Sequence, residues 1–405
     1  MARRSRRAGK GSITSYTTKA GTRWRYQLWV PIDPEQPDNG DRQTGKAGFA
    51  TAEDADNALT DAKNQLKNRI KFVRTAPTIA AYADQWIAGL QLEASTIAGY
   101  KRLAKNHVKP KLGDLTLDKV TATRLAAHYK YLRTEGRKDA GHVGEPLSAN
   151  TVNKVHVLIG AMFDAAKDDG YIAVNPARKA GIVKAPTGRQ IKAAKPEMLT
   201  WTREQLAAFL AWNRNELEDD YYPLWHLIAY TGMRRSEALA LRWADIDQAS
   251  GRVSIRRALD TTARGTVKLT KTGGARVVNL DKNTLDVLKS YRAKRGAVAL
   301  SLAGGTGYVF GNLDGTSRQP KAITKAWGLR MGWAKAALGE DVLPHMTLKG
   351  LRHTHASLLL ESGEHPKVVQ ERLGHSTITT TMDIYSHVSP TMQREAADRF
   401  AALVQ

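Results

Sequence analysis

The chain has 405 residues, with an apolar content of 42% and a charged content of 25%, values typical of globular proteins. This length is enough for about two to three domains. The net charge of +23 attracts polyanions, and nucleic acid is the polyanion whose phosphates bind lysine and arginine with release of counterions. Because the chain has no cysteine, disulfides, thiolate nucleophiles and cysteine-ligated zinc are excluded.

Neither a membrane span nor a secretion signal is predicted. No apolar run approaches the ~18 residues that a membrane span needs. The basic start at residues 2–7 is not followed by the apolar segment of a signal peptide. We therefore expect a cytoplasmic protein without a membrane partner.

Residues 1–75 predict a small three-stranded sheet with one helix. Bulky and polar residues alternate at 12–16 and 23–30, and a third short strand is expected at 48–50. Thr51 is expected to cap a helix that runs to about Lys71. The first ten residues hold five cations and no acid. We expect this basic tail and the cationic sheet face to contact DNA through Arg3, Arg4, Arg6, Arg7, Arg23, Trp24 and Arg25.

Residues 76–180 predict a helical domain. Apolar residues recur at three- and four-residue steps from Ile79 to Val108, over 122–133, and from about Asn150 to Gly170. These stripes are expected to form the core. Five cations lie off the stripes, where they can follow a DNA backbone: Lys101, Arg102, Lys105, Lys109 and Lys111. Residues 181–197 are basic, rich in Ala, Gly and Pro and without periodicity, which predicts a flexible linker.

Residues 198–405 predict a mixed α+β domain. Thr202 and Gln205 have the spacing of a capping box at a helix start. Further helices are expected over 222–230 and from Arg234, followed by short strands at 252–256, 266–269 and 276–280. Helices then continue to the end, the last of them over 389–405.

Several motifs in this last domain suggest one chemistry. They are Thr-Gly-Met-Arg-Arg-Ser-Glu at 231–237, Leu-Arg-His-Thr-His-Ala at 351–356, Leu-Gly-His at 373–375, and Tyr385. Arginine grips two phosphate oxygens with its planar fork and stays charged. Nearby cations favour the phenolate of a tyrosine, the form that attacks, and a lysine can protonate the leaving oxygen. The combination predicts cleavage of a phosphodiester by Tyr385, without a metal or other cofactor.

In these motifs the chain resembles the tyrosine recombinases, specifically the integrases of phages and mobile elements. The resemblance implies a site-specific DNA recombinase that integrates or excises a mobile element through a 3′-phosphotyrosine, independently of metal and ATP. It implies that Glu237, one turn beyond Arg234, supports that arginine. The implied catalytic residues are Arg234, Lys271, Lys349, Arg352, His375 and Tyr385.

The resemblance also implies an architecture and a set of partners. Gly99-Tyr100 and Asn175-Pro176 are similar to positions in the family's mainly α core-binding domain, and the N-terminal sheet with its helix is similar to an arm-binding domain. The expected partners are double-stranded DNA attachment sites, further copies of the chain in a homo-tetramer, and an excisionase or DNA-bending protein. The C-terminal helix would dock onto a neighbour in that tetramer. The expected location is the nucleoid of a bacterial host.

Two other functions fit part of the pattern. A non-enzymatic DNA-binding regulator would keep the basic surface, but it would need neither Tyr385 nor the two arginines. A type IB topoisomerase would share the chemistry, but it would relax supercoils without sequence preference and would need no arm-binding domain. A covalent adduct on a nicked DNA site, lost in Tyr385→Phe, separates the recombinase from the regulator.

One position departs from the family pattern. The family usually has a histidine three residues before its second arginine, where this chain has Lys349. A cationic lysine still donates to a phosphate oxygen, but it does not readily act as a general base. We therefore expect Lys349→Ala to weaken covalent cleavage of DNA without abolishing it. Complete loss of cleavage with DNA binding intact would contradict a purely electrostatic role.

Overall fold

The computed structural model describes most of the 405 residues. The described ranges are 9–18, 21–32, 40–67, 76–196, 198–263, 265–269 and 275–383, with 394, 397, 398 and 400–402 near the end. By compactness the chain divides into two units, Met1–Lys195 and Pro196–Gln405, and each is considered by itself. Some predicted site residues lie outside the described ranges: Arg3, Arg4, Arg6, Arg7, Lys271 and Tyr385.

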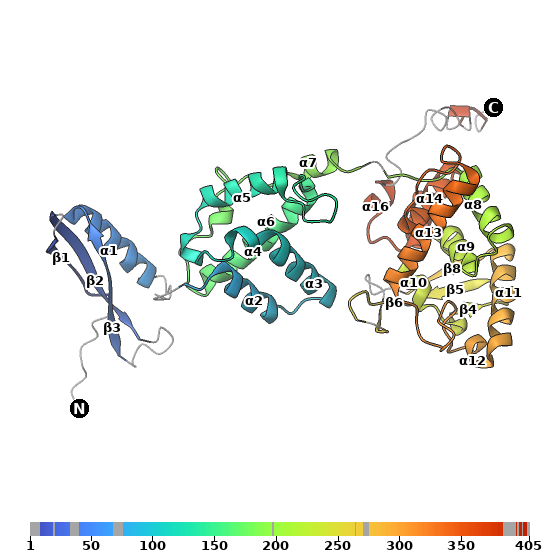
Figure 1. Ribbon diagram of the computed structural model, residues 1–405, viewed down its shortest axis with the longest axis horizontal. Helices are drawn as coiled ribbons and strands as arrows, with labels where there is room; N and C mark the ends of the chain where they lie inside the picture. The colour runs from blue at the N-terminus through green and yellow to red at the C-terminus, as the bar shows by residue number, and fades with distance from the viewer. Residues whose placement is uncertain are drawn as a thin grey trace. The chain divides into compact units, whose positions relative to one another are not determined.

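The N-terminal module is an antiparallel sheet with a helix on one face (Figure 1). Strands β1 (Gly11–Thr18), β2 (Gly21–Pro31) and β3 (Asp41–Phe49) pair in that order, and α1 (Ala52–Lys67) follows. Leu28 and Val30 of β2 pack against Leu59 of α1. The Asp54 amide donates to Thr51 Oγ1 over 3.0 Å, so Thr51 caps α1 as predicted.

Strand β3 is longer than the sequence indicated. It runs from Asp41 to Phe49, so the third strand predicted near 48–50 is present, but the prediction missed residues 41–47. The residues that were missed are mainly polar or small. Because β3 is an edge strand with mostly exposed side chains, it buries little apolar surface and shows no alternation of apolar and polar residues.

The helical module consists of α2 (Ile79–Gly89), α3 (Ala94–Leu103), α4 (Lys109–Leu112), α5 (Ala122–Glu135) and α6 (Ala149–Asp168). A π-helical turn at Ala104–Val108 joins α3 to α4. Val155, Ile159 and Phe163 of α6 are fully buried in the module's core, as their periodicity predicted. Within the segment expected to be a flexible linker, residues Gly188–Ala193 form a short helix, α7, because Thr187 and Gln190 make a capping box.

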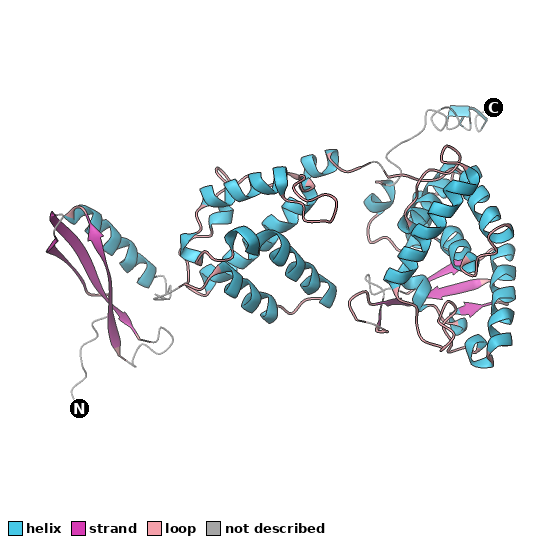
Figure 2. Cartoon of the chain, in the orientation of Figure 1, coloured by secondary structure: helices cyan, strands magenta, loops and turns pink. Residues whose placement is uncertain are grey.

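The second unit surrounds a small sheet with helices (Figure 2). Strands β4 (Ile246–Asp247), β5 (Arg252–Ile255) and β8 (Arg276–Asn279) form an antiparallel sheet, and β6 (Arg257–Leu259) pairs with β7 (Val267–Leu269). Sequence periodicity missed β4 and β6, which are too short to show it. The helices are α8 (Arg203–Asn215), α9 (Tyr222–Thr231), α10 (Arg235–Ala240), α11 (Lys282–Val298), α12 (Leu300–Ala303), α13 (Pro320–Leu338), α14 (Leu348–Glu361), α15 (Pro366–Leu373) and α16 (Ile378–Met382).

An aromatic cluster fixes the helices of this unit. The ring of Trp327 on α13 lies 5.0 Å from that of Phe209 and 5.1 Å from that of Trp225, centre to centre. Its indole N–H donates to the Met346 carbonyl over 2.7 Å. The cluster therefore joins α8, α9 and α13 to the segment that leads into α14. Among the described residues, no helix is both long and apolar enough to cross a membrane.

The buried and exposed tryptophans of α13 allow a test of this core. Trp327 is 2% exposed, and Trp333 on the same helix is 47% exposed. We expect Trp327→Ala to lower the free energy of unfolding by about 3–5 kcal/mol, because it leaves a cavity in packed surroundings. Trp333→Ala should cost less than about 1 kcal/mol. Urea denaturation of the full chain measures both, and equal losses would contradict this description of the core.

Candidate active site

The turn between α9 and α10 positions the first arginine. Gly232 ends α9 in a left-handed conformation with φ of 64°. A side chain there would meet Leu373 and, at 2.7 Å, the ring of His355. Glycine therefore permits both the turn and the close approach of α14 and α15. Two residues on, Arg234 stands at the start of α10 with its side chain 40% exposed.

Glu237 lies beside Arg234, as the three-residue spacing predicted, and it binds a second arginine that sequence reasoning missed. Arg234 Nη1 donates to Glu237 Oε1 over 2.7 Å, and the Arg234 amide donates to Oε2 over 2.9 Å. Arg276, the first residue of β8, donates from Nη1 to Oε1 over 3.1 Å and from Nη2 to Oε2 over 2.6 Å. Burial alone would raise the pKa of Glu237, but the two arginines outweigh it and lower that pKa.

Arg352 is buried on α14, only 4% exposed. Its Nη1 donates to the Gly232 carbonyl over 2.6 Å, and its Nη2 donates to the Leu373 carbonyl over 2.7 Å. Burial, together with the charges of Arg234 and Arg276, lowers the pKa of Arg352 to about 9. The guanidinium is therefore still charged at neutral pH.

Three consecutive carbonyls at the end of α15 each accept a hydrogen bond from a different arginine. The Arg372 carbonyl accepts from Arg276 Nε over 2.9 Å, the Leu373 carbonyl from Arg352 Nη2, and the Gly374 carbonyl from Arg234 Nη2 over 3.1 Å. Carbonyls at a helix C-terminus lack helical partners and carry partial negative charge. This helix end therefore gathers three cations around one carboxylate, with a surplus of positive charge.

His375 follows this turn directly. Its Nδ1 lies 2.9 Å from Thr381 Oγ1, and Thr381 on α16 is fully buried. Burial, with the charges of Arg352 and Arg234, lowers the pKa of His375 to about 4, so it is neutral at pH 7. Sequence reasoning missed Thr381, because it stands in a run of three threonines with nothing to single it out.

The remaining predicted catalytic residues are only partly placed. Lys349 is exposed on α14, one turn before Arg352 and hence on the same side of that helix. Lys271 and Tyr385 lie outside the described residues. The described chain ends at Leu269 before Lys271 and resumes at Ala275, between β7 and β8. Helix α16 ends at Met382, shortly before Tyr385.

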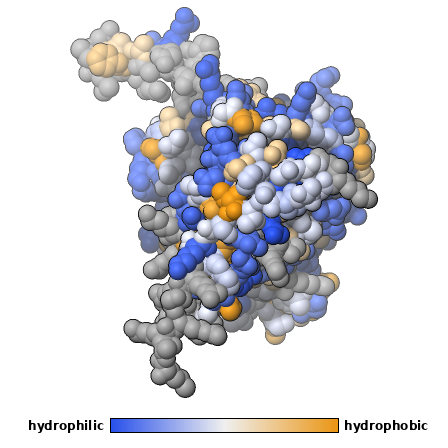
Figure 3. All heavy atoms as spheres, turned by 90° about the vertical axis from the view of Figure 1, so that its left-hand side faces the viewer, coloured by the Kyte–Doolittle hydropathy of each residue, from blue (hydrophilic) through white to orange (hydrophobic). Residues whose placement is uncertain are grey.

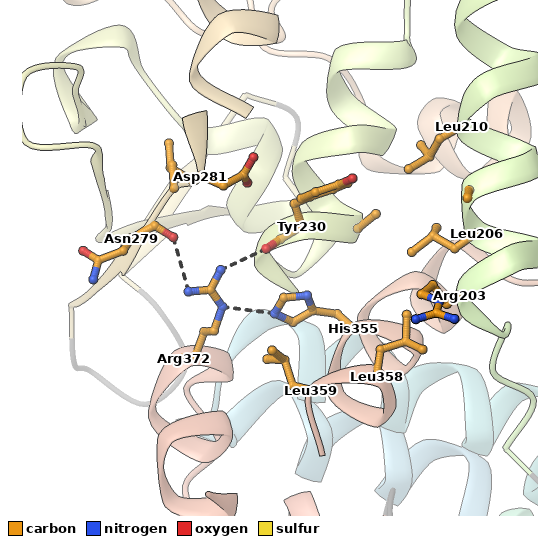
Figure 4. Close-up of a pocket in the computed structure, with 13 residues that line it drawn as sticks. Arg203, Leu206, Leu210, Tyr230, Asn279, Asp281, His355, Leu358, Leu359 and Arg372 are labelled. Carbon is orange, nitrogen blue, oxygen red and sulfur yellow. Dashed lines mark hydrogen bonds between the residues drawn. The ribbon is translucent and has the colours of Figure 1, made fainter. Parts of the chain in front are cut away.

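Two arginines near the cluster have structural contacts of their own. Arg235, next to Arg234, is half-buried and donates to Thr324 on α13. Arg372 donates from Nε to His355 Nε2 over 3.1 Å, from Nη1 to the Asn279 carbonyl over 3.2 Å, and from Nη2 to the Tyr230 carbonyl over 2.9 Å. Figure 4 shows the three contacts of Arg372 at the edge of a cavity of about 640 Å³. Its apolar lining includes Leu206, Leu210, Leu358 and Leu359.

Among the predicted DNA-contacting residues that the structure describes in the first unit, Arg23 and Trp24 are half-buried and the others are exposed. Arg25 is exposed, and its guanidinium lies 5.8 Å from the centre of the Tyr16 ring. Strand alternation places Arg23 and Arg25 on the sheet face away from α1 and Trp24 on the α1 side. Lys101, Arg102 and Lys105 are exposed on α3 and the π-helical turn. The described surface in Figure 3 is largely hydrophilic, with small separate hydrophobic groups.

Two family models match the chain. The model described as "Phage integrase family" matches residues 201–392, and "Phage integrase SAM-like domain" matches residues 78–182. The tyrosine recombinase XerD of Mycobacterium tuberculosis strain H37Rv is 30% identical over 329 residues, which are 78% of this chain and 94% of that protein. The integrase of Mycobacterium phage D29 is 24% identical over 412 residues, 98% of each chain.

Solved structures share the fold. The Tn1549 transposon integrase in complex with a circular intermediate DNA has a TM-score of 0.65 at 20% identity, over 80% of this chain and 100% of that one. A lambda integrase, in a tetramer bound to a Holliday junction, has a TM-score of 0.56 at 17% identity, over 91% and 94%. The fold class predicted from the sequence is thereby confirmed.

His355 makes the stability of the second unit dependent on pH. Burial and the charge of Arg372 lower the pKa of His355 to about 3, from 6.5 in the unfolded chain. Between these values the unfolded chain binds a proton that the folded chain does not, so stability is lost as the pH falls from 6.5 towards 3. His355→Gln keeps an acceptor for Arg372 but does not titrate. We expect its urea midpoint to fall less steeply over this range than that of the unsubstituted chain, and parallel slopes would contradict the assignment.

Proposed function

Because the chain belongs to the tyrosine recombinase family, we propose that it is the integrase of a mobile DNA element and that Arg234, Arg352 and His375 hold the scissile phosphate. The protein is a site-specific DNA recombinase, and DNA is its partner. The observation that carries the proposed site is the arginine cluster at the end of α15, where Arg234 and Arg352 are anchored on adjacent carbonyls immediately before His375.

The clamp works by having its donors in place before the reaction begins. Arg352 is fixed at both ends of its guanidinium by carbonyls, and Arg234 is fixed on one side by Glu237 and Gly374. Both retain further N–H groups for the nonbridging oxygens of a phosphate. Fixed donors stabilise the charge that builds on those oxygens without reorganising during the reaction. His375, neutral and held by Thr381, adds a hydrogen bond without adding charge.

Strand cleavage then follows from Tyr385 and Lys271. Tyr385 gives its phenol proton to solvent, its phenolate oxygen attacks phosphorus, the bond from phosphorus to the 5′ oxygen breaks, and Lys271 gives that oxygen a proton. The product is a 3′-phosphotyrosine and a free 5′ hydroxyl. Attack by the 5′ hydroxyl of a partner strand reverses these steps and releases Tyr385. The phosphotyrosine conserves the energy of the phosphodiester, so rejoining needs no ATP. Lys349 contributes positive charge, which favours the phenolate of Tyr385.

Each module of the chain makes its own contacts with DNA. Residues 1–75 form an arm-binding domain that uses Arg23, Arg25 and the basic tail, and residues 76–180 form a core-binding domain that uses Lys101, Arg102 and Lys105. Residues 181–197 connect it to the catalytic domain at 198–405. Arginine and lysine side chains bind phosphates with release of counterions, which makes the affinity fall as salt is raised. We place the protein with the bacterial nucleoid, where its attachment sites lie.

Four copies of the chain act together on two attachment sites. The similar lambda integrase was solved as a tetramer bound to a Holliday junction, the intermediate that exchange of one strand pair creates. The C-terminal segment includes Phe400, whose side chain is exposed and would otherwise face water. We assign it to the apolar cavity beside Arg372 on a neighbouring copy. An excisionase or DNA-bending protein sets the direction of recombination.

Covalent trapping on DNA tests the proposed centre. The substrate is a suicide duplex, nicked beside the scissile phosphate, with its attachment sequence taken from DNA flanking the gene. We expect the unsubstituted chain to form a covalent adduct, Tyr385→Phe to form none, and Arg234→Ala and Arg352→Ala to be slower by about 10²–10³-fold, the usual cost of removing one oxyanion donor. Arg235→Ala is the matched control, because Arg235 contacts Thr324. An adduct on Tyr385→Phe would overturn the assignment.

A further inference from the structure

We propose that Arg276 is a positioning residue of the phosphate clamp, which acts by sharing the Glu237 carboxylate with Arg234. The inference rests on the proposed function of Arg234 in holding the phosphate. Arg276 itself is 11% exposed, and three of its N–H groups donate to Glu237 and to the Arg372 carbonyl. It is therefore occupied by protein atoms, and any effect on catalysis must pass through the groups it holds.

The effect of Arg276 on catalysis arises at the carboxylate of Glu237. Each of its oxygens accepts one hydrogen bond from Arg276 and one from Arg234. If Arg276 were removed, each oxygen of this buried carboxylate would lose one donor, and Arg234 would be the remaining cation among these partners. A buried carboxylate with too few donors is costly. The guanidinium of Arg234 would then turn towards Glu237 and away from the phosphate.

Arg276 also ties the clamp to the strand that follows Lys271. It is the first residue of β8 and pairs with Ile255 of β5. Its Nε donates to a carbonyl of the same helix end that holds Arg234 and Arg352. Gly374 leaves room for this contact, since a side chain at that position would come within 3.1 Å of Arg276. The base of the segment that carries Lys271 is thus fixed against the clamp.

A second buried ion pair in this unit serves as the matched control. Arg330 donates from Nε and Nη2 to the two oxygens of Asp219 over 3.0 and 2.9 Å. Both pairs are bidentate, and both join a mostly buried arginine to a buried carboxylate. Asp219 contacts Asn213 and Trp225 in the core, and neither Arg330 nor Asp219 contacts the α15 end. The loss of Arg330 therefore reports the cost of removing a structural arginine.

The test compares two suicide duplexes, one with a natural scissile phosphate and one with a methylphosphonate, which carries no charge and therefore needs less neutralisation. We expect Arg276→Met to slow adduct formation by about 10²-fold or more on the phosphate. On the methylphosphonate, the rate for Arg276→Met should come within about tenfold of the rate for the unsubstituted chain. The reason is that the uncharged substrate leaves less negative charge for Arg234 to stabilise. Arg330→Met should change both rates by one common factor.

Each outcome decides the inference. Equal defects of Arg276→Met on the two substrates would indicate a structural role only and overturn it, as would a normal rate on the phosphate. If Arg276→Met does not fold, Arg276→Lys replaces it. A slower rate of adduct formation on the phosphate, restored on the methylphosphonate, then supports the proposal even if the slowing is smaller. A chain without any Tyr385 adduct would overturn the proposed function together with this inference. A Tyr385 adduct formed at equal rates with and without Arg276 would overturn this inference alone.

Discussion

The arrangement of the second unit depends on keeping three like charges together at one helix end. Arg234, Arg276 and Arg352 repel one another, and Arg352 and Arg276 are largely removed from water. Such burial is tolerated when every cation has hydrogen-bond partners and an opposite charge nearby. Glu237 supplies the charge, and the last carbonyls of α15 supply the partners. Gly374, in its left-handed conformation with φ of 66°, ends the helix so that these carbonyls are available.

This one helix end also determines how neighbouring elements must pack. Arg234 comes from the start of α10, Arg276 from β8 and Arg352 from α14, and each is bonded to the same turn. Arg352 also donates to the Gly232 carbonyl at the end of α9, and Trp225 of α9 packs against Trp327. A displacement of α15 would therefore break contacts to several elements at once.

The sequence predicted the pairing of Arg234 with Glu237, but not the other partners in this cluster. Arg234 and Glu237 follow from helical spacing, since side chains three residues apart share a face. The apolar stripes predicted the helices for the same reason, because burial imposes a period. Arg276 has no such signal: alternation in β8 indicates which face it occupies, but its carboxylate partner lies 39 residues away and is set by tertiary packing. The same holds for Thr381, and for β3, whose exposed edge position removes the pattern that identifies strands.

The two clamp arginines differ in a way that suits different tasks. Arg352 is 4% exposed and held at both ends of its guanidinium, whereas Arg234 is 40% exposed and would be open to a bound DNA in the proposed function. The same charges that attract the phosphate also lower the pKa of His375 to about 4. A protonated histidine would add a further cation to a cluster that already repels itself. In the proposed clamp a neutral His375, held by Thr381, would donate to the phosphate without that cost, so the charge of the cluster favours the protonation state that suits the proposed role.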